Sequence, residues 1–224
     1  MRSILATLLI VTVGAFAVAA DSNDPVAVEI VQVVHVPTTD GDPVLLDGLF
    51  RETVWDSAAY VVVNERTTLR FAQYRGHLFV GIDCPEVLAP VPDIYLAYDS
   101  STLLQIHVSA QLGERVHFPH RPGFEAPRFV WGETYDWYAN EFRWNSPLTD
   151  SLVRKAGQKW EEAMKTASFD SEGTEIQILR TKIPSDTLRF RLELGEGGQY
   201  DKPTIFPKET NLESIDDWLM LVLE

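Results

Sequence analysis

The chain has 224 residues, a formal net charge of −14 and a single cysteine, Cys84. Such a charge repels nucleic-acid phosphates and anionic membrane surfaces, which argues against partners of both kinds. A hydrophobic content of 45% and an aromatic content of 11% are those of a globular protein and exclude a disordered one. One cysteine cannot form an internal disulfide, and the strand-like run before Cys84 predicts a buried, small apolar side chain.

Residues 1–20 have the layout of a secretory signal peptide. Arg2 gives a basic start, residues 4–13 are apolar, and Ala17 and Ala19 fit the small-residue cleavage rule. The apolar run is shorter than the about 20 residues that a membrane span needs. We therefore expect a secreted chain, extracellular or periplasmic and without membrane insertion, in which residues 21–224 form a single domain.

Short β-type runs follow, separated by turn signals about every ten residues. Arg75-Gly76 has the composition of a tight turn between two of these runs, which predicts a hairpin, and residues 111–114 indicate another turn. Strands are expected over residues 26–36, 59–63, 67–74, 77–83, 94–98 and 103–110. This rhythm is typical of a sandwich or jelly roll.

The middle of the chain interrupts this rhythm. Residues 118–144 are rich in proline, glycine and aromatic side chains, which indicates a long loop region. Residues 150–167 place apolar side chains on one helical face, which predicts a helix. Strands are expected again over residues 174–180, 188–194 and 215–223. The sequence therefore predicts an all-β fold, a jelly-roll-like β-sandwich with one inserted helix.

Signatures of catalysis are missing from the sequence, which has no zinc-binding helix motif, nucleophile elbow or phosphate-binding loop. His117 and His120, with Glu125 nearby, resemble metal ligands, although a loop with two surface histidines is commoner. Carboxylate pairs such as Asp216/Asp217 leave a glycoside hydrolase as an alternative, yet an acidic chain holds such pairs by chance. We expect no catalytic residues.

Aromatic side chains between Phe129 and Trp144 are the strongest indication of a binding site. Polar residues alternate with them, and a sugar needs this mixture, because its ring faces stack on Trp while its hydroxyls hydrogen-bond. A small core under a long loop is the alternative, since Trp is usually well buried. The predicted ligand-binding residues are Trp131, Trp137, Asn140, Arg143 and Trp144.

Four segments, in chain order, resemble family 9 carbohydrate-binding modules and the related DOMON-like domains. Residues 46–58 resemble the opening D-G-x-x-x-E-x-x-W-x-x-A pattern, in which Asp47-Gly48 would form a turn and Trp55 would plug one end of the sandwich. Residues 68–83 are similar to the next pair of strands and residues 92–99 to the D-x-V-x-I-x-x-D strand. Residues 174–188 resemble the E-x-x-I-P-x-x-x-L segment.

The resemblance implies a jelly-roll sandwich that binds glycans beside glycoside hydrolases, often with structural calcium. Acidic residues in 21–24 and 40–42 offer oxygen ligands of the hardness that calcium prefers, but no calcium ligand is assigned. Members of the family clamp a terminal sugar between two Trp, one before the D-x-V-x-I strand and one before the last strand. Residues 84–92 and 200–214 contain no Trp, so a site in this chain has to use other aromatic side chains.

We expect a secreted, non-catalytic protein that binds a poly- or oligosaccharide in connection with glycan breakdown, with a glycoside hydrolase or the cell envelope as its partner. Three alternatives stay open: an interaction domain of the cell envelope without a small ligand, a glycoside hydrolase, and a haem-binding DOMON-like electron carrier. Haem needs axial ligands, and no histidine is obviously paired with Met164 or Met220.

Overall fold

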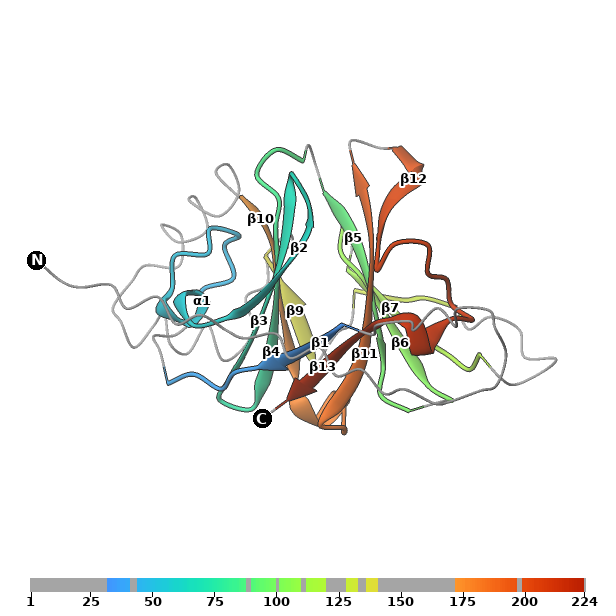
Figure 1. The fold of residues 1–224 in the computed structure, drawn as a ribbon, viewed down its shortest axis with the longest axis horizontal. Helices are drawn as coiled ribbons and strands as arrows, with labels where there is room; N and C mark the ends of the chain where they lie inside the picture. Colours follow the sequence, from blue (N-terminus) through green and yellow to red (C-terminus); the bar gives the residue numbers. More distant parts are fainter. Residues whose placement is uncertain are drawn as a thin grey trace, which may run out of the picture.

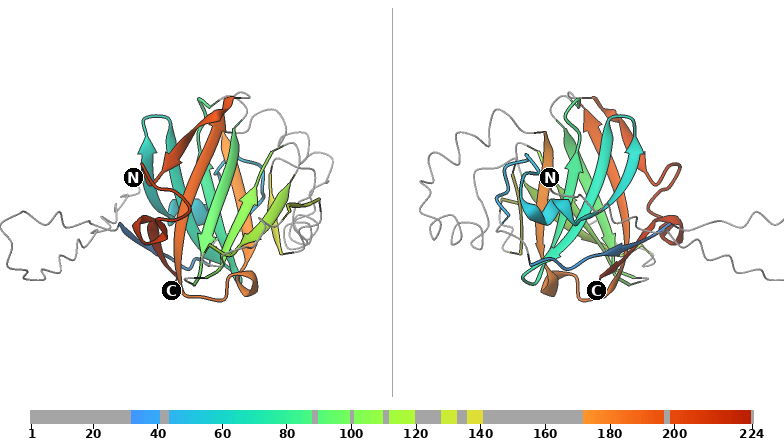
Figure 2. Two further views of the ribbon diagram at one scale, coloured as in Figure 1. Left: turned by 90° about the vertical axis from the view of Figure 1, so that its right-hand side faces the viewer. Right: turned by 60° about the vertical axis from the view of Figure 1, so that its left-hand side comes forward.

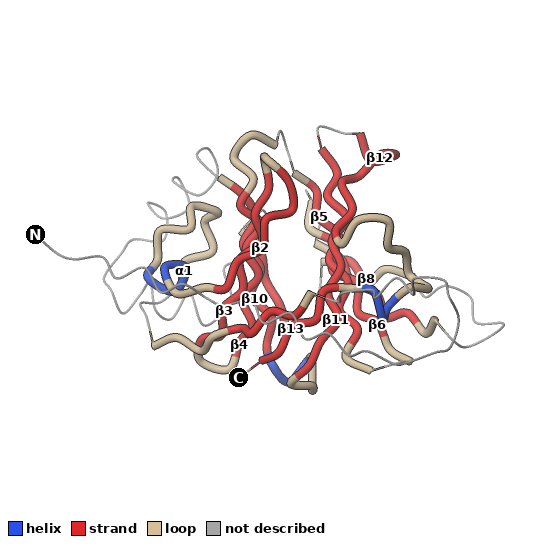
Figure 3. Tube along the Cα trace, viewed as in Figure 1, coloured by secondary structure: helices blue, strands red, loops and turns tan. Residues whose placement is uncertain are grey.

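The structure is a computed structural model that describes residues 32–40, 44–87, 90–99, 101–109, 112–119, 128–132, 136–140, 172–196 and 199–223. Within these ranges the chain is mostly β-structure, as Figure 1 and Figure 3 show, with one short helix, α1 (Thr53–Asp56). The strands are β1 (Val33–Val36), β2 (Ala59–Asn64), β3 (Thr67–Tyr74), β4 (His77–Asp83), β5 (Val91–Ala97), β6 (Leu103–His107), β7 (Gly113–His117), β8 (Val130–Trp131), β9 (Trp137–Ala139), β10 (Gly173–Leu179), β11 (Thr187–Glu196), β12 (Gln199–Phe206) and β13 (Leu219–Leu223). No described helix is long and apolar enough to cross a membrane.

The strands form two sheets that face each other (Figure 1). Sheet A has the order β1-β13-β11-β5-β6-β7-β8, and β12 pairs with β11 outside this path. Sheet B has the order β2-β3-β4-β10-β9. The left view of Figure 2 shows sheet A broadside, with β11 in orange beside green strands. The fold is therefore an all-β sandwich.

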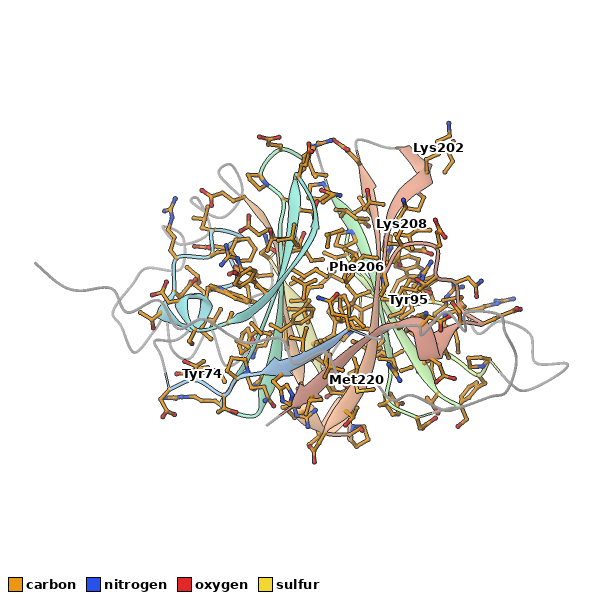
Figure 4. All side chains as sticks on the ribbon, in the orientation of Figure 1. Tyr74, Tyr95, Lys202, Phe206, Lys208 and Met220 are labelled. Atoms are coloured by element: carbon orange, nitrogen blue, oxygen red, sulfur yellow. The ribbon has the colours of Figure 1, made fainter. Side chains whose placement is uncertain are left out.

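Apolar side chains from both sheets meet in one core between the layers. They come from alternate positions of each strand, because successive side chains of a strand point to opposite faces. Phe71 of β3 and Phe190 of β11 meet edge to face across this core, with ring centroids 5.1 Å apart. Phe206 of β12 packs against the same core (Figure 4). Burying each such side chain stabilises the fold by about 1.5–3 kcal/mol.

The β3–β4 hairpin lies at the middle of sheet B and follows its sequence signals closely. Arg75 and Gly76 both have positive φ, 46° and 76°, as the two central residues of a type I′ turn require. The turn sets a register in which Tyr74 pairs with His77 and Thr68 with Asp83. The predicted hairpin is confirmed, together with both of its strand ranges.

The segment around β1 forms hydrogen bonds with both sheets, and we call residues 33–39 the strap. Val33 to Val36 pair in parallel with β13 at the edge of sheet A. The chain then bonds to β3 of sheet B, where Gln73 N donates to the Pro37 carbonyl (2.8 Å) and Thr39 N donates to the Gln73 carbonyl (2.9 Å). In Figure 1 the strap crosses the lower side of the sandwich. It therefore closes the gap between the sheets with backbone hydrogen bonds.

Several predicted elements need correction. Residues 215–217 form a short 3-10 helix, and only Leu219–Leu223 is the final strand; Trp218, between them, is fully buried against Tyr95 on the outer side of sheet A. Gly113 and Glu114 belong to β7, whereas a turn was predicted there, and β12 was not predicted at all. The predicted helix over residues 150–167 lies outside the described residues, as do most of residues 26–32.

Trp55 is buried on the outer face of sheet B, and so it covers a sheet and does not plug an end of the sandwich. Phe50 and Trp55 lie over Gly81 of β4, where an added Cβ would come within 2.6 Å of the Phe50 ring and 3.2 Å of the Trp55 ring. The absence of a side chain at Gly81 lets both rings approach the strand closely. Gly48, in the loop that carries these rings, has a φ of 75°, as the predicted turn requires.

Candidate functional site

Polar and aromatic side chains gather on the outer side of sheet A, over β5 to β8. Ile94, Leu104 and Ile106 point into the core, so their neighbours along each strand point outward. The register then aligns these outward residues in two rows across the sheet. One row is Asp93, His107, Gly113 and Trp131, and the other is Tyr95, Gln105 and Arg115. We call these residues, together with His117 and Phe129, the aromatic–polar face.

Hydrogen bonds connect the polar side chains of this face into one network around Gln105, which is buried. The Gln105 amide Nε2 donates to Asp93 Oδ1 (2.6 Å), and Gln105 Oε1 accepts from Arg115 Nε (2.6 Å). His117 Nε2 lies 2.8 Å from the same Oε1, so that nitrogen carries the ring proton. His107 Nδ1 lies 3.1 Å from Asp93 Oδ2. The network fixes each of these side chains in place.

Burial and the nearby Arg115 charge lower the pKa of His117 to about 4. His117 is therefore neutral at ordinary pH, and its Nδ1 atom is an acceptor while Nε2 donates. Arg115 supplies a permanent positive charge to the face, since a guanidinium does not lose its proton in proteins.

The aromatic part of the face is a pair of stacked rings at its edge. The ring centroids of Phe129 and Trp131 lie 4.8 Å apart, and the two ring planes make an angle of 24°. Trp131 is 44% exposed. Trp131 lies close against β7 because Gly113, its cross-strand partner, has no side chain; a Cβ there would come within 2.5 Å of the Trp131 ring. The His107 ring then meets Trp131 edge-on at 5.6 Å. The face thus joins an exposed flat ring to fixed donors and acceptors.

The five predicted site residues lie in different environments, and two of them are outside the described residues. Trp131 is exposed on the aromatic–polar face. Trp137 is fully buried, and its Nε1 donates to Glu114 Oε2 (2.6 Å), so its ring offers no face to a ligand. Asn140 uses its amide to hold the backbone of β10, where it accepts from Glu175 N (2.7 Å) and donates to the Gly173 carbonyl (3.0 Å). Arg143 and Trp144 lie outside the described residues.

Sequence reasoning missed the polar members of the face. Gln105 and His107 lie two apart on β6, and Arg115 and His117 lie two apart on β7. Hydrogen-bonding side chains at every second position of two consecutive strands indicate a shared polar face, and this signal was available. His120 and Glu125, which resemble metal ligands together with His117 in the sequence, lie outside the described residues.

A second polar group lies on the outer side of sheet B, and we call Asp47, Glu52 and Glu175 the carboxylate cluster. Their carboxylate oxygens lie within 4.8 Å of one another. Glu175 Oε2 accepts from the backbone N–H groups of Asp47 (2.8 Å) and Gly48 (2.7 Å), and its Oε1 accepts from Trp55 Nε1 (2.7 Å). Glu52 Oε1 accepts from Leu45 N (3.0 Å), and Glu52 Oε2 is buried without a hydrogen bond.

Burial dominates the electrostatics of this cluster. It raises the pKa of Asp47, raises that of Glu52 to about 7, and raises that of Glu175 well above its usual value, where the Glu52 charge adds to the effect. The described residues supply three carboxylates, and both Glu175 oxygens already accept hydrogen bonds, whereas calcium takes six to eight oxygens. The carboxylate cluster does not complete a calcium site. Of the acidic residues in the predicted calcium loops, only Asp40 lies within the described residues.

A hollow of about 420 Å³ lies between the β2–β3 turn, the β4–β5 loop and the β11–β12 hairpin. It is lined by Asn64, Glu65, Arg66, Thr67, Val87, Leu194, Glu196 and Thr204. Val87 and Thr204 belong to the two segments in which the resembled family carries its clamping tryptophans. The described residues of the lining include no aromatic side chain for a sugar to stack on, so the aromatic–polar face is the better candidate.

Comparison with known proteins adds no relative to this description. No protein-family model matches the chain, and neither the curated proteins nor the solved structures contain a match.

Proposed function

We propose that this protein is a secreted, non-catalytic carbohydrate-binding protein that holds a poly- or oligosaccharide on its aromatic–polar face. The observation that carries the proposal is the exposed Trp131 ring, stacked on Phe129 and bordered by fixed hydrogen-bonding side chains. A sugar ring presents an apolar face and hydroxyls along its edge, and this surface offers a partner for each.

The resemblance to family 9 carbohydrate-binding modules and a jelly-roll topology belong to this proposal. Two well-separated parts of the resemblance meet in the carboxylate cluster, because Glu175 binds the Asp47-Gly48 backbone and Trp55. One buried carboxylate thus binds all three of these residues of the opening pattern, through the backbone of Asp47 and Gly48 and through the indole of Trp55. The same burial removes Glu175 from any substrate, which supports a binding role over hydrolysis by this cluster.

The binding test begins with the mature protein, residues 21–224, on a glycan array, followed by calorimetry with each oligosaccharide that binds. Trp131→Ala should weaken binding about 2- to 10-fold, because stacking on one aromatic ring contributes about 0.5–1.5 kcal/mol. Tyr60→Ala is the matched control, since Tyr60 is an exposed aromatic residue (67%) on β2, at the far edge of sheet B. Binding that survives Trp131→Ala unchanged refutes the proposed site.

Two further measurements address secretion and catalysis. N-terminal sequencing of the exported protein should begin at Asp21 or within a residue or two of it. Incubation with a panel of polysaccharides should release no reducing sugar. Turnover that a single Asp or Glu substitution abolishes would identify a glycoside hydrolase instead.

A second candidate function, docking to another protein of the cell envelope, is favoured by the edge strand β2. Tyr60 and Val62 are 67% and 62% exposed on this strand, which among the described strands pairs only with β3. Exposed apolar residues on an edge strand are typical of a surface that another chain covers. A partner that binds wild-type protein and not Tyr60→Ala, with no glycan ligand on the array, would favour this function over the first.

A further inference from the structure

We infer that the glycan on the aromatic–polar face is acidic, and that Arg115 binds the anionic substituent of the sugar that stacks on Trp131. This inference rests on the proposed function and specifies its ligand class. The anionic group is a carboxylate, as in a uronic acid, or a sulfate ester; both present the oxygens that a guanidinium binds.

Arg115 is fixed in place before any ligand arrives. Its Nε donates to Gln105 Oε1 (2.6 Å), and its guanidinium carbon lies 4.5 Å from the centre of the Phe129 ring. Phe129 in turn stacks on Trp131, so the cation and the exposed ring contact the same aromatic side chain. A held guanidinium loses less side-chain entropy when it binds an anion than a free one would.

The two terminal nitrogens of Arg115 have no hydrogen bond or ion pair with the described part of the chain. Most other half-buried or buried cations of the same ranges have a carboxylate: Arg70 has Asp83 (2.7 Å), Lys182 has Glu114 (3.0 Å) and Arg180 has Asp186 (2.9 Å). Arg189 has none of these, but its Nη1 donates to the Trp218 carbonyl (3.3 Å). Arg191, also on the outer side of sheet A, has Glu193 (2.7 Å). A half-buried guanidinium that lacks such a partner, in a chain of net charge −14, is an open anion site.

The acidic residues nearest to Arg115 along the sheet are occupied elsewhere. Asp93 accepts from Gln105 and lies against His107. Glu114, the neighbour of Arg115 in sequence, faces the other side of β7, where Trp137 and Lys182 bind it. Gln105 separates Asp93 from Arg115, because it donates to the first and accepts from the second. The positive charge at the end of the face is therefore available to an external anion.

The test compares matched pairs of ligands by calorimetry with the mature protein. One pair is a uronic-acid oligosaccharide and its carboxyl-reduced form, and the other is a sulfated oligosaccharide and its desulfated form. We expect the acidic member of at least one pair to bind about 10- to 100-fold more tightly than its neutral counterpart, the range for a hydrogen bond to a charged group. The pair that shows the difference identifies the carboxylate or the sulfate.

Arg115→Gln should remove this preference, so that the acidic and neutral members of a pair bind with equal affinity. Arg128→Gln is the matched control, because Arg128 is exposed just before Phe129 and its loss changes the net charge equally; it should keep the preference. Arg115→Lys keeps the positive charge but loses the planar arrangement of guanidinium donors. Its preference for the acidic ligand should therefore lie between those of wild type and Arg115→Gln. Melting curves of all three variants show whether each is folded.

The outcomes separate the two proposals. Trp131-dependent binding in which neutral and acidic ligands are equal, or in which Arg115→Gln keeps the acidic preference, overturns the inference and leaves the proposed function standing. If no ligand binds, or if Trp131→Ala leaves the affinity unchanged, both the inference and the proposed function are overturned.

Discussion

The carboxylate cluster and the aromatic–polar face are both polar groups on the outer side of a sheet, and they differ in what covers them. The first lies beneath the loop that carries Trp55, and backbone and indole N–H groups occupy both oxygens of Glu175. The second has an exposed Trp131 and an arginine whose terminal nitrogens have no partner among the described residues. A buried carboxylate that is fully bonded, as Glu175 is, holds a fold together, whereas exposed polar groups with spare capacity can hold a ligand.

Glu175→Ala should give the largest change in stability and so test the first half of this contrast. It leaves three buried donors unpaired, each at a cost of about 1–3 kcal/mol, and we expect a loss of about 3–5 kcal/mol in the free energy of unfolding. Chemical denaturation measures it. Gln105→Ala on the aromatic–polar face is the control, and water can replace its bonds, so it should cost about 1 kcal/mol. Equal losses would contradict the contrast.

Glu52 predicts a fall in stability with rising pH. The folded state keeps the Glu52 proton up to about pH 7, whereas the unfolded chain releases it near pH 4.5. Between these values the folded state binds more protons, so the free energy of unfolding decreases as pH rises, by up to about 3 kcal/mol at about 1.4 kcal/mol per pKa unit. Denaturation from pH 4.5 to 8 measures the slope. Glu52→Gln should show a smaller decrease, since the raised pKa values of Asp47 and Glu175 act in the same direction, and an identical profile would refute the assignment.

His117 predicts a smaller pH effect of opposite sign. Its pKa is about 4 in the folded state and near 6.5 in the unfolded chain, so the unfolded chain binds more protons between these values. The His117 contribution is complete above about pH 6.5 and is lost as pH falls toward 4. The Glu52→Gln variant lacks the Glu52 share of the opposing slope, so the His117 effect is easier to measure in it. Adding His117→Gln should make the free energy of unfolding change less favourably from pH 4 to 6.5 than in Glu52→Gln alone; an unchanged profile would mean that His117 makes no such contribution.

Trp131→Ala should give the smallest change in stability. The ring is 44% exposed, so we expect a loss of less than about 1 kcal/mol despite the loss of ligand binding. Trp137→Ala is the comparison, because it empties a fully buried site and should cost about 3–5 kcal/mol. Melting temperatures of the two variants distinguish them. A similar drop for both would mean that Trp131 belongs to the core.

Local chemistry explains which parts of the fold could be predicted from sequence. The β3–β4 hairpin follows from alternation and from Arg75-Gly76, signals that lie within the hairpin itself. Trp131 and Trp137 come from one aromatic segment and share its composition, yet β8 pairs with β7 in sheet A and β9 pairs with β10 in sheet B. Pairing over long distances decides which ring is exposed, and no local pattern records it.

The candidate site could also be predicted only in part from the sequence. Alternation along β6 and β7 could have placed Gln105 and Arg115 on one face. The space that Gly113 leaves for Trp131 depends on a cross-strand register that spans the segment between β7 and β8, and sequence does not give it. The bonds of Glu175 to Asp47, Gly48 and Trp55 also join residues more than one hundred positions apart.

The strap also bears on the order in which the sandwich assembles. Its residues 33–36 pair with residues 220–223, so almost all of the described chain lies between the partners. Closing so large a loop costs chain entropy before the contact contributes any stabilising free energy. Pairings between segments so far apart in sequence therefore slow folding. During synthesis β1 cannot pair with β13 until residues 220–223 have left the ribosome. The edge of sheet A therefore stays open until β13 has been made, and its closure is a late step in the assembly of the sandwich.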